Sequence, residues 1–355
     1  MPTNRLYATV MKQLRQLRPD EPQPRLNNLA WMMIGVFLSR SVQLHRIAVK
    51  IPWPHAVLLS GVRRLQRFVD NRWVQVRDWY APVARQARTG EVRLIMDATQ
   101  VSGRWQWLTV SVAFQHRAIP LAWTWLRGPR GHSSAQVQLA LLRYVQGLLP
   151  TNPRVLLVAD TEFESGEVQH QLQTWHWHYV LRQKPNNLVH RAGGWQACGT
   201  LLTHAGQQVW LEQVTLTQKH QTVTNLLAYW QVGQDQPWLL ATNLPTPRAV
   251  LQAYYRRMWI EEMYGDLKAH GFYLADSHLQ SFQRLSRLAL IVVLVYLWIV
   301  QRGVTVIRHG QRRLVDRNDR RDLSVFQIGL RWLERRLTLQ LPIPFSLPMA
   351  ELSGS

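Results

Sequence analysis

Three consecutive strand-like segments begin at residue 92 and limit the folds that this chain can adopt. VRLIMD (92–97), WQWLTVSVAF (105–114) and AIPLAWTWL (118–126) are rich in β-branched and aromatic residues, which favour strands. The breaks between these segments are short and suit antiparallel neighbours. We therefore expect three adjacent strands at the start of a sheet.

Strand–helix units follow these three strands. The pattern predicts a helix from about 133 to 148, a buried strand RVLLVAD at 154–160, a helix near 164–174 and a strand HYVLRQ at 178–183. Strands that alternate with helices are typical of α/β proteins with parallel pairing. Together with the first three strands, they predict an α/β fold with a mixed sheet that helices cover.

The pattern of helix-like and strand-like segments, together with charge, divides the chain into four regions. Their expected bounds are 1–90 (helical and basic), 91–183 with 237–302 (the sheet core, with helices over about 246–269 and 279–301), 184–236 (a β-rich insertion) and 303–355 (a basic tail). The insertion is assigned from short β-like runs separated by Gly, Asn and Gln. The tail either folds back on the core or contacts a partner.

The charge balance points to a polyanionic partner. Lys and Arg number 42 against 21 for Asp and Glu, which gives a formal net charge of +21. This excess is typical of proteins that bind nucleic acid, so double-stranded DNA is the expected partner. The single cysteine, Cys198, excludes an intrachain disulfide and a Cys-based zinc site, which fits a reducing cytoplasm.

One apolar run raises the question of a membrane. LALIVVLVYLWIV at 288–300 has 13 residues, whereas a helix needs about 20 to span a bilayer. The N-terminus has no apolar core of a signal peptide. We therefore interpret 288–300 as a buried core helix and expect no membrane partner.

A basic helix is expected within the first 90 residues. In GVRRLQRFVDNRWVQVRDWY, Arg63, Arg64 and Arg67 interleave with Leu65 and Phe68, so the helix has one apolar and one basic face. An ordinary solvated face would have the same pattern. The position in the most basic third of the chain favours contact with DNA phosphates.

Two aspartates close apolar strand-like runs in the same way. Asp97 follows LIM, and Asp160 follows LLVA. The carboxyl ends of strands in an α/β sheet face the crevice where ligands bind. A single aspartate at such a place is commonly a turn or helix cap, but a pair from one sheet indicates a site.

A third acid comes from the segment MWIEEMYGDLKAHG and the residues before it. At 100° per residue, Tyr254, Arg257, Glu261 and Lys268 lie within an arc of about 60°. Glu262 and Asp266 lie off this stripe. The alternative is a pair of ordinary helical salt bridges, one between Arg257 and Glu261 and one between Lys268 and a neighbouring acid.

Three carboxylates, from two strands and a helix, form a set of candidate metal ligands that are all oxygen atoms. Asp97, Asp160 and Glu261 therefore suit Mg²⁺, with Mn²⁺ as a substitute, and do not suit zinc. Two such ions can activate water or a 3′-hydroxyl in phosphoryl transfer and stabilise the leaving oxygen. Cations on the same stripe can receive the phosphates of the substrate.

The order and spacing of these residues resemble a known family. Tyr254, Arg257, Glu261 and Lys268 match the YREK signature of DDE transposases of bacterial insertion sequences, the insertion-sequence-four group and its relatives. IMDATQVSG and VADTEFESG precede them in the right order. The resemblance covers roughly residues 60–300.

The resemblance implies a ribonuclease-H-like core with a β-rich insertion. It also implies that Asp97, Asp160 and Glu261 bind the metal ions, and that Tyr254, Arg257 and Lys268 contact transposon-end DNA. In relatives that form a DNA hairpin, an aromatic residue of the insertion holds a flipped base. The candidates here are Trp195, Trp210 and Trp230, but the chain has 17 tryptophans, so core packing is the favoured role for any one of them.

The expected protein is a cut-and-paste transposase that binds terminal inverted repeats, cleaves the ends and joins the 3′ ends to target DNA. It is expected to act as a homodimer on DNA in the bacterial cytoplasm, at the nucleoid. Two alternatives remain at this point. They are a catalytically inactive DNA-binding regulator derived from a transposase and a related ribonuclease-H-like nuclease.

Overall fold

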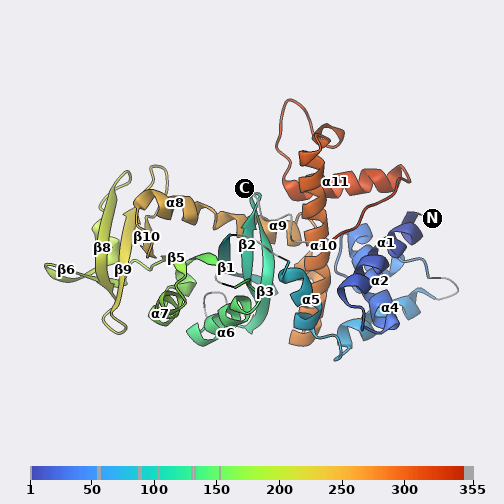
Figure 1. Cartoon of the computed structure of the whole chain (residues 1–355), viewed down its shortest axis with the longest axis horizontal. Helices are drawn as coiled ribbons and strands as arrows, with labels where there is room; N and C mark the ends of the chain where they lie inside the picture. The colour runs from blue at the N-terminus through green and yellow to red at the C-terminus, as the bar shows by residue number, and fades with distance from the viewer. Residues whose placement is uncertain are drawn as a thin grey trace. The chain divides into compact units, whose positions relative to one another are not determined.

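The structure is a computed structural model, and it describes residues 2–53, 57–86, 90–102, 104–128, 131, 133–151 and 153–347. The chain divides into two compact units (Figure 1). One unit combines residues 1–88 with 263–355, and the other consists of residues 89–262. The sheet lies wholly in the second unit.

The second unit contains one sheet of ten strands within the described residues. The strands are β1 (Glu91–Ser102), β2 (Trp105–Phe114), β3 (Arg117–Arg127), β4 (Arg154–Ala159), β5 (His178–Arg182), β6 (Leu188–Arg191), β7 (Gly194–Ala197), β8 (Gln208–Leu216), β9 (Thr222–Tyr229) and β10 (Trp238–Thr242). Their order across the sheet is β3-β2-β1-β4-β5-β10-β9-β8-β6-β7.

The first half of the sheet has the pairing that the sequence predicts. β1, β2 and β3 are antiparallel neighbours, and β4 and β5 run parallel to β1. Helices α6 (Ala135–Gln146) and α7 (Gly166–Thr174) pack on one another and on strands, and α8 (Pro247–Tyr255) packs on β4 and β5 (Figure 1). This mixed α/β arrangement is the ribonuclease-H-like fold, so the predicted fold class is confirmed.

The region predicted as a β-rich insertion extends the same sheet. β10 pairs antiparallel with β5, and β9 and β8 continue outward from β10. These strands bury an apolar cluster together with β6 and the 3-10 turn Cys198–Leu201, and it includes Val189, Cys198, Leu216 and Leu226. Burial raises the pKa of the Cys198 thiol to about 12, so this cysteine stays protonated as a core residue.

The first unit is helical. Its helices are α1 (Pro2–Leu17), α2 (Gln23–Ser39), α3 (Leu44–Val49), α4 (Leu58–Asp70), α5 (Val76–Ala84), α10 (Phe282–Arg308) and α11 (Val325–Thr338). Within the part of the chain described, α10 is the one helix long and apolar enough to cross a membrane, yet 83% of its apolar window is buried. It packs against α2, α4, α5 and α11, so the apolar run at 288–300 is the core helix that was predicted.

The packing of α10 places it outside the predicted catalytic core. The sequence assigns 237–302 to one region, whereas the structure groups residues from 263 onward with the N-terminal helices. The apolar stripe of α10 faces those helices and buries its side chains against them. The basic tail after residue 303 likewise folds back, because α11 packs on α10.

Two glycines allow α10 and α11 to approach closely. A Cβ atom on Gly329 would lie 2.0 Å from the Ile299 carbonyl oxygen, and one on Gly303 would lie 1.9 Å from that of Val325. Both contacts involve backbone atoms, which cannot rotate away. The two helices must therefore separate to accept any larger residue at either position.

We predict that Gly329→Ala destabilises the helical unit by about 3 kcal/mol, because the added methyl group overpacks the helix crossing. Urea unfolding followed by circular dichroism measures the loss. Gly147→Ala is the matched control, since its Cβ would meet no atom nearer than 3.6 Å. Equal unfolding midpoints for the two variants would contradict the close crossing.

Candidate active site

The strand register brings three polar residues side by side where the parallel pairing of β1, β4 and β5 ends, which we call the ladder edge. Met96 on β1 pairs with Ala159 on β4, and Ala159 pairs with Leu181 on β5. The next residue on each strand or strand end is Asp97, Asp160 or Arg182. Side chains at equivalent positions of adjacent strands point to the same face, so these three lie side by side.

Asp97 and Asp160 differ in their local settings. β1 continues past Asp97 to Ser102, so the prediction that Asp97 ends its strand is wrong. Only the parallel pairing with β4 stops there, and beyond that point β1 pairs with β2 alone. Asp160 does follow the last residue of β4, where its side chain accepts a hydrogen bond from the Thr161 N–H and caps a 3-10 turn, η1 (Thr161–Phe163).

The segment that carries Tyr254, Arg257 and Glu261 is not one helix. The sequence predicts a helix over about 246–269, but the structure has α8 up to Tyr255 and α9 from Met258 to Leu267. Between them, the Arg257 N–H donates to Tyr254 and the Ile260 N–H to Arg257, which are i→i−3 bonds of a tightened turn. The angles calculated for a straight helix therefore do not apply across this turn.

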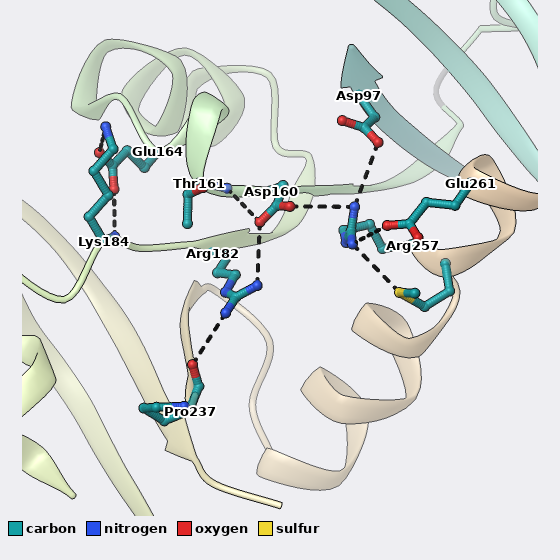
Figure 2. Close-up of polar contacts among 10 residues, drawn as sticks. Asp97, Asp160, Thr161, Glu164, Arg182, Lys184, Pro237, Arg257 and Glu261 are labelled. Carbon is teal, nitrogen blue, oxygen red and sulfur yellow. Dashed lines mark hydrogen bonds and ion pairs between the residues drawn. The ribbon is translucent and has the colours of Figure 1, made fainter. Parts of the chain in front are cut away.

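The turn places the Arg257 guanidinium among all three predicted acids (Figure 2). Its Nη1 lies 3.6 Å from Asp97 Oδ2 and 3.5 Å from Asp160 Oδ2, and its Nη2 donates to Glu261 Oε1 at 2.6 Å. The Arg257 and Asp97 side chains are 8% and 5% exposed, whereas that of Glu261 is 46% exposed. The salt bridge between Arg257 and Glu261 is thus present, but it is one of three ionic contacts that Arg257 makes with carboxylates.

Neighbouring charges and burial shift the pKa of Arg257 in opposite directions. Burial alone would lower the pKa of Arg257, but the negative charges of Asp160, Asp97 and Glu261 raise it above its usual value. Arg257 is therefore charged at every physiological pH. Burial also raises the pKa of the Tyr254 hydroxyl, and Asp160 raises it further, so Tyr254 is a neutral donor.

Arg182 is a site residue that the sequence reasoning missed. Its Nη1 lies 3.8 Å from Asp160 Oδ1, and its side chain is 22% exposed (Figure 2). The available signal was the motif VLR, in which Arg182 ends a buried parallel strand just as Asp160 follows one. An arginine at this edge can both hold the aspartate and receive a phosphate.

Comparison with known proteins identifies the family of this arrangement. A profile described as "Transposase DDE domain" matches residues 89–298, more than half of the chain. The chain belongs to the DDE transposase domain family. Comparison with curated proteins found no match. Among solved structures, the chain is similar to the cryo-EM structure of a piggyBac transposase synaptic complex with hairpin DNA, at 8% identity and a TM-score of 0.45, over 98% of this chain and 79% of that one.

DDE transposases use divalent metal ions, and the carboxylates of this transposase domain suit them chemically. As the side chains stand, no group of three or more His, Cys, Asp or Glu within the described residues is close enough to hold an ion. The Arg257 guanidinium separates the acids instead. Its Nε and Nη1 are buried without a hydrogen-bond partner in that part of the chain, so the guanidinium fills the space with incomplete hydrogen bonding.

The charge count of the site also favours a divalent cation. Three carboxylates face Arg257, and Arg182 adds a second cation beside Asp160 only. The acids exceed the arginines by one charge in a partly buried cluster, where unbalanced charge is costly. Asp97, Asp160 and Glu261 thus fit Mg²⁺ or Mn²⁺ once Arg257 moves aside.

Two other charged residues of the segment MWIEEMYGDLKAHG, Glu262 and Lys268, have other partners than Arg257. Glu262 is 61% exposed and pairs with Arg117 at 3.3 Å instead of with Arg257. Lys268 follows the last residue of α9 and belongs to the helical unit, where its ammonium lies 6.0 Å from the Tyr264 ring. Its predicted DNA contact stays a prediction.

The predicted basic face of α4 is present in the helical unit of the transposase. Leu65, Phe68 and Val69 are buried, and Arg63, Arg64 and Arg67 are exposed. The Arg64 Nε donates to Asn28 Oδ1 at 2.7 Å and its guanidinium lies over the Trp53 ring. Arg64 therefore has a structural role as well.

The candidate tryptophans of the transposase insertion have separate local partners. Trp195 lies against His190, and the Trp210 Nε1 donates to Glu212. Trp230 packs against the apolar cluster of the outer strands and donates to the Gln234 carbonyl. Trp230 thus has the core-packing role that the sequence left open.

We predict that Arg257→Gln makes the transposase less stable in EDTA, by on the order of 1–3 kcal/mol, because the acids lose their shared cation. The partial exposure of Asp160 and Glu261 keeps the loss below that of a fully buried pair. Mn²⁺ should then raise the melting temperature of Arg257→Gln more than that of wild type, because its competitor is gone.

The matched control for this prediction is Arg256→Gln, since Arg256 bonds only the Gln252 carbonyl among the contacts described for its side chain. Thermal melts in EDTA and over a Mn²⁺ series compare the three proteins. An equal Mn²⁺ response in all three would show that Arg257 and the ion do not share one site.

Proposed function

We propose that this protein is a cut-and-paste transposase of the insertion-sequence-four-like group with the YREK signature. Its substrate is the terminal inverted repeats of its own element, whose 3′ ends it frees and joins to target DNA. The observation that supports this most directly is the convergence of Asp97, Asp160 and Glu261 on one cationic group. Carboxylates arranged around a cation are the arrangement that metal-dependent phosphoryl transfer needs.

In this proposal, Asp97 and Asp160 at the edge of the sheet and Glu261 on α9 hold the metal ions. When bound, the ions supply an activated water or hydroxyl nucleophile and stabilise the leaving oxygen. Arg257 gives up its place among the acids and turns to the phosphates beside the scissile bond. Arg182 and the protonated Tyr254 contribute further donors to those phosphates.

In this proposal, the helical unit supplies much of the affinity for DNA. Arg63 and Arg67 project from the exposed face of α4, and each phosphate that they neutralise releases counterions. Lys268 contacts the transposon end as a point charge. The active species is a homodimer on DNA, and the protein works at the nucleoid of the bacterial cytoplasm.

We predict that Asp97→Asn, Asp160→Asn and Glu261→Gln each abolish end cleavage and strand transfer but keep most DNA binding. Each change removes a negatively charged ligand and keeps the side-chain volume. The assay uses a supercoiled plasmid that carries both ends of the element, with Mg²⁺. Wild-type protein that neither nicks nor cleaves these ends would refute the proposed function.

Glu262→Gln is the control for the Glu261 variant, because Glu262 is adjacent in sequence and pairs with Arg117 instead. It should retain cleavage within about twofold to fivefold of wild type, as expected for loss of a largely exposed ion pair. An inactive Glu262 variant beside an active Glu261 variant would mean that the neighbouring acid is the ligand.

Arg182 allows a separate test of phosphate contact. We predict that Arg182→Lys slows cleavage by at least tenfold, because a lysine cannot bridge Asp160 and a phosphate with two planar donors. Its midpoint for Mn²⁺ in thermal melts should stay at the wild-type value. A shifted Mn²⁺ midpoint with normal cleavage at saturating metal would instead show that Arg182 only positions Asp160.

A further inference from the structure

A hollow with four arginines in its lining lies between the connection that joins α10 to α11 and α11 itself, in the helical unit. Its volume is about 530 Å³, which is within the range of pockets that hold nucleotide-sized groups. The charged residues around it are Arg313, Arg317, Arg320, Arg331, Asp316 and Asp322. The carboxylate site does not use any of them.

Both acids of this hollow are already paired. Arg312 Nε lies 2.6 Å from Asp316 Oδ2, and the Asp316 side chain is 1% exposed. Arg320 Nε lies 3.1 Å from Asp322 Oδ2. The charges of Arg313, Arg317 and Arg331 therefore remain unbalanced by the acids that line the hollow, and all three residues are exposed.

The frame of the hollow is held by internal bonds. Arg312 joins its two sides, because its Nε bonds Asp316 while its Nη2 donates to the Leu323 carbonyl at 3.4 Å. Arg331 comes from α11, which packs closely on α10. A preformed cluster of arginines loses less conformational freedom on binding than arginines on a mobile tail.

We propose that this hollow binds the backbone phosphates of DNA, at a place separate from the carboxylate site. Phosphodiester oxygens accept two parallel hydrogen bonds from one guanidinium, and three uncompensated arginines suit consecutive phosphates. Leu314, which is 46% exposed and lines the hollow, offers an apolar surface to a deoxyribose. The inference depends on the proposed function only in taking DNA as the partner.

The test compares DNA affinity of the full chain and the double variant Arg313→Ala/Arg331→Ala. The probe is a fluorescein-labelled 30-base-pair duplex, and anisotropy is measured between about 50 and 300 mM NaCl. We expect roughly tenfold weaker binding at 100 mM NaCl. The slope of log affinity against log salt should fall by about 2, since each phosphate contact contributes about 0.9.

The matched control is Arg154→Ala/Arg191→Ala, which removes the same charge from two exposed arginines of the other unit. Equal losses in both double variants would overturn the proposal, because the net charge of the chain would then account for the binding. If the hollow variant unfolds at a lower temperature, Arg317→Ala, a single exposed change, replaces it with an expected slope change of about 1.

Two further measurements distinguish DNA binding at the hollow from self-association and from cleavage. Sedimentation of both double variants reports self-association, and a change there with unaltered DNA binding would show that the hollow meets an acidic protein surface instead. Cleavage of element ends is measured independently. Absence of cleavage in the wild type would refute the proposed function, while the binding comparison would still decide the role of the hollow.

Discussion

The ionic contact of Arg257 with three carboxylates is the interaction on which the candidate site of the sheet-containing unit depends. Asp97 is almost wholly buried, and a buried carboxylate without a cation would be strongly unfavourable. Arg257 supplies that cation from the turn between α8 and α9, and the same guanidinium reaches Asp160 and Glu261. With Arg257 and Arg182 in place, the three carboxylates keep one excess negative charge, which a divalent ion in the place of Arg257 would balance.

The parallel ladder explains why these side chains meet. Residues 96, 159 and 181 are aligned across β1, β4 and β5, which fixes the following residues of all three strands at one edge. The capping bond of Asp160 to the Thr161 N–H and the bond of Asp97 Oδ1 to the Ala98 N–H hold each carboxylate against its own backbone. Rigid placement of this kind is what a preorganised site requires.

The sequence predicted the strands and the three acids because both depend on local patterns. Runs such as RVLLVAD alternate with helical periodicity, and each acid follows an apolar run or lies in a conspicuous segment. It did not predict the break after Tyr255, since neither Gly nor Pro marks it. It also missed Arg182 and the pairing of β10 with β5, because strand order and register arise from tertiary contacts that no local period encodes.

The acids of this basic chain differ in the number of cationic and hydrogen-bonding partners that surround them. Glu21 has Arg18 and Arg25, Glu164 accepts bonds from Lys184 and Asn187, and Asp316 has Arg312, so these carboxylates are matched or exceeded by donors. Around Arg257 the ratio reverses, because Asp97 and Asp160 at the ladder edge and Glu261 of α9 share one buried guanidinium. The surface of the molecule therefore attracts a polyanion, whereas this one edge attracts a cation. Metal-dependent chemistry on a nucleic acid needs both properties in one chain, because the ion must be held where the phosphate arrives.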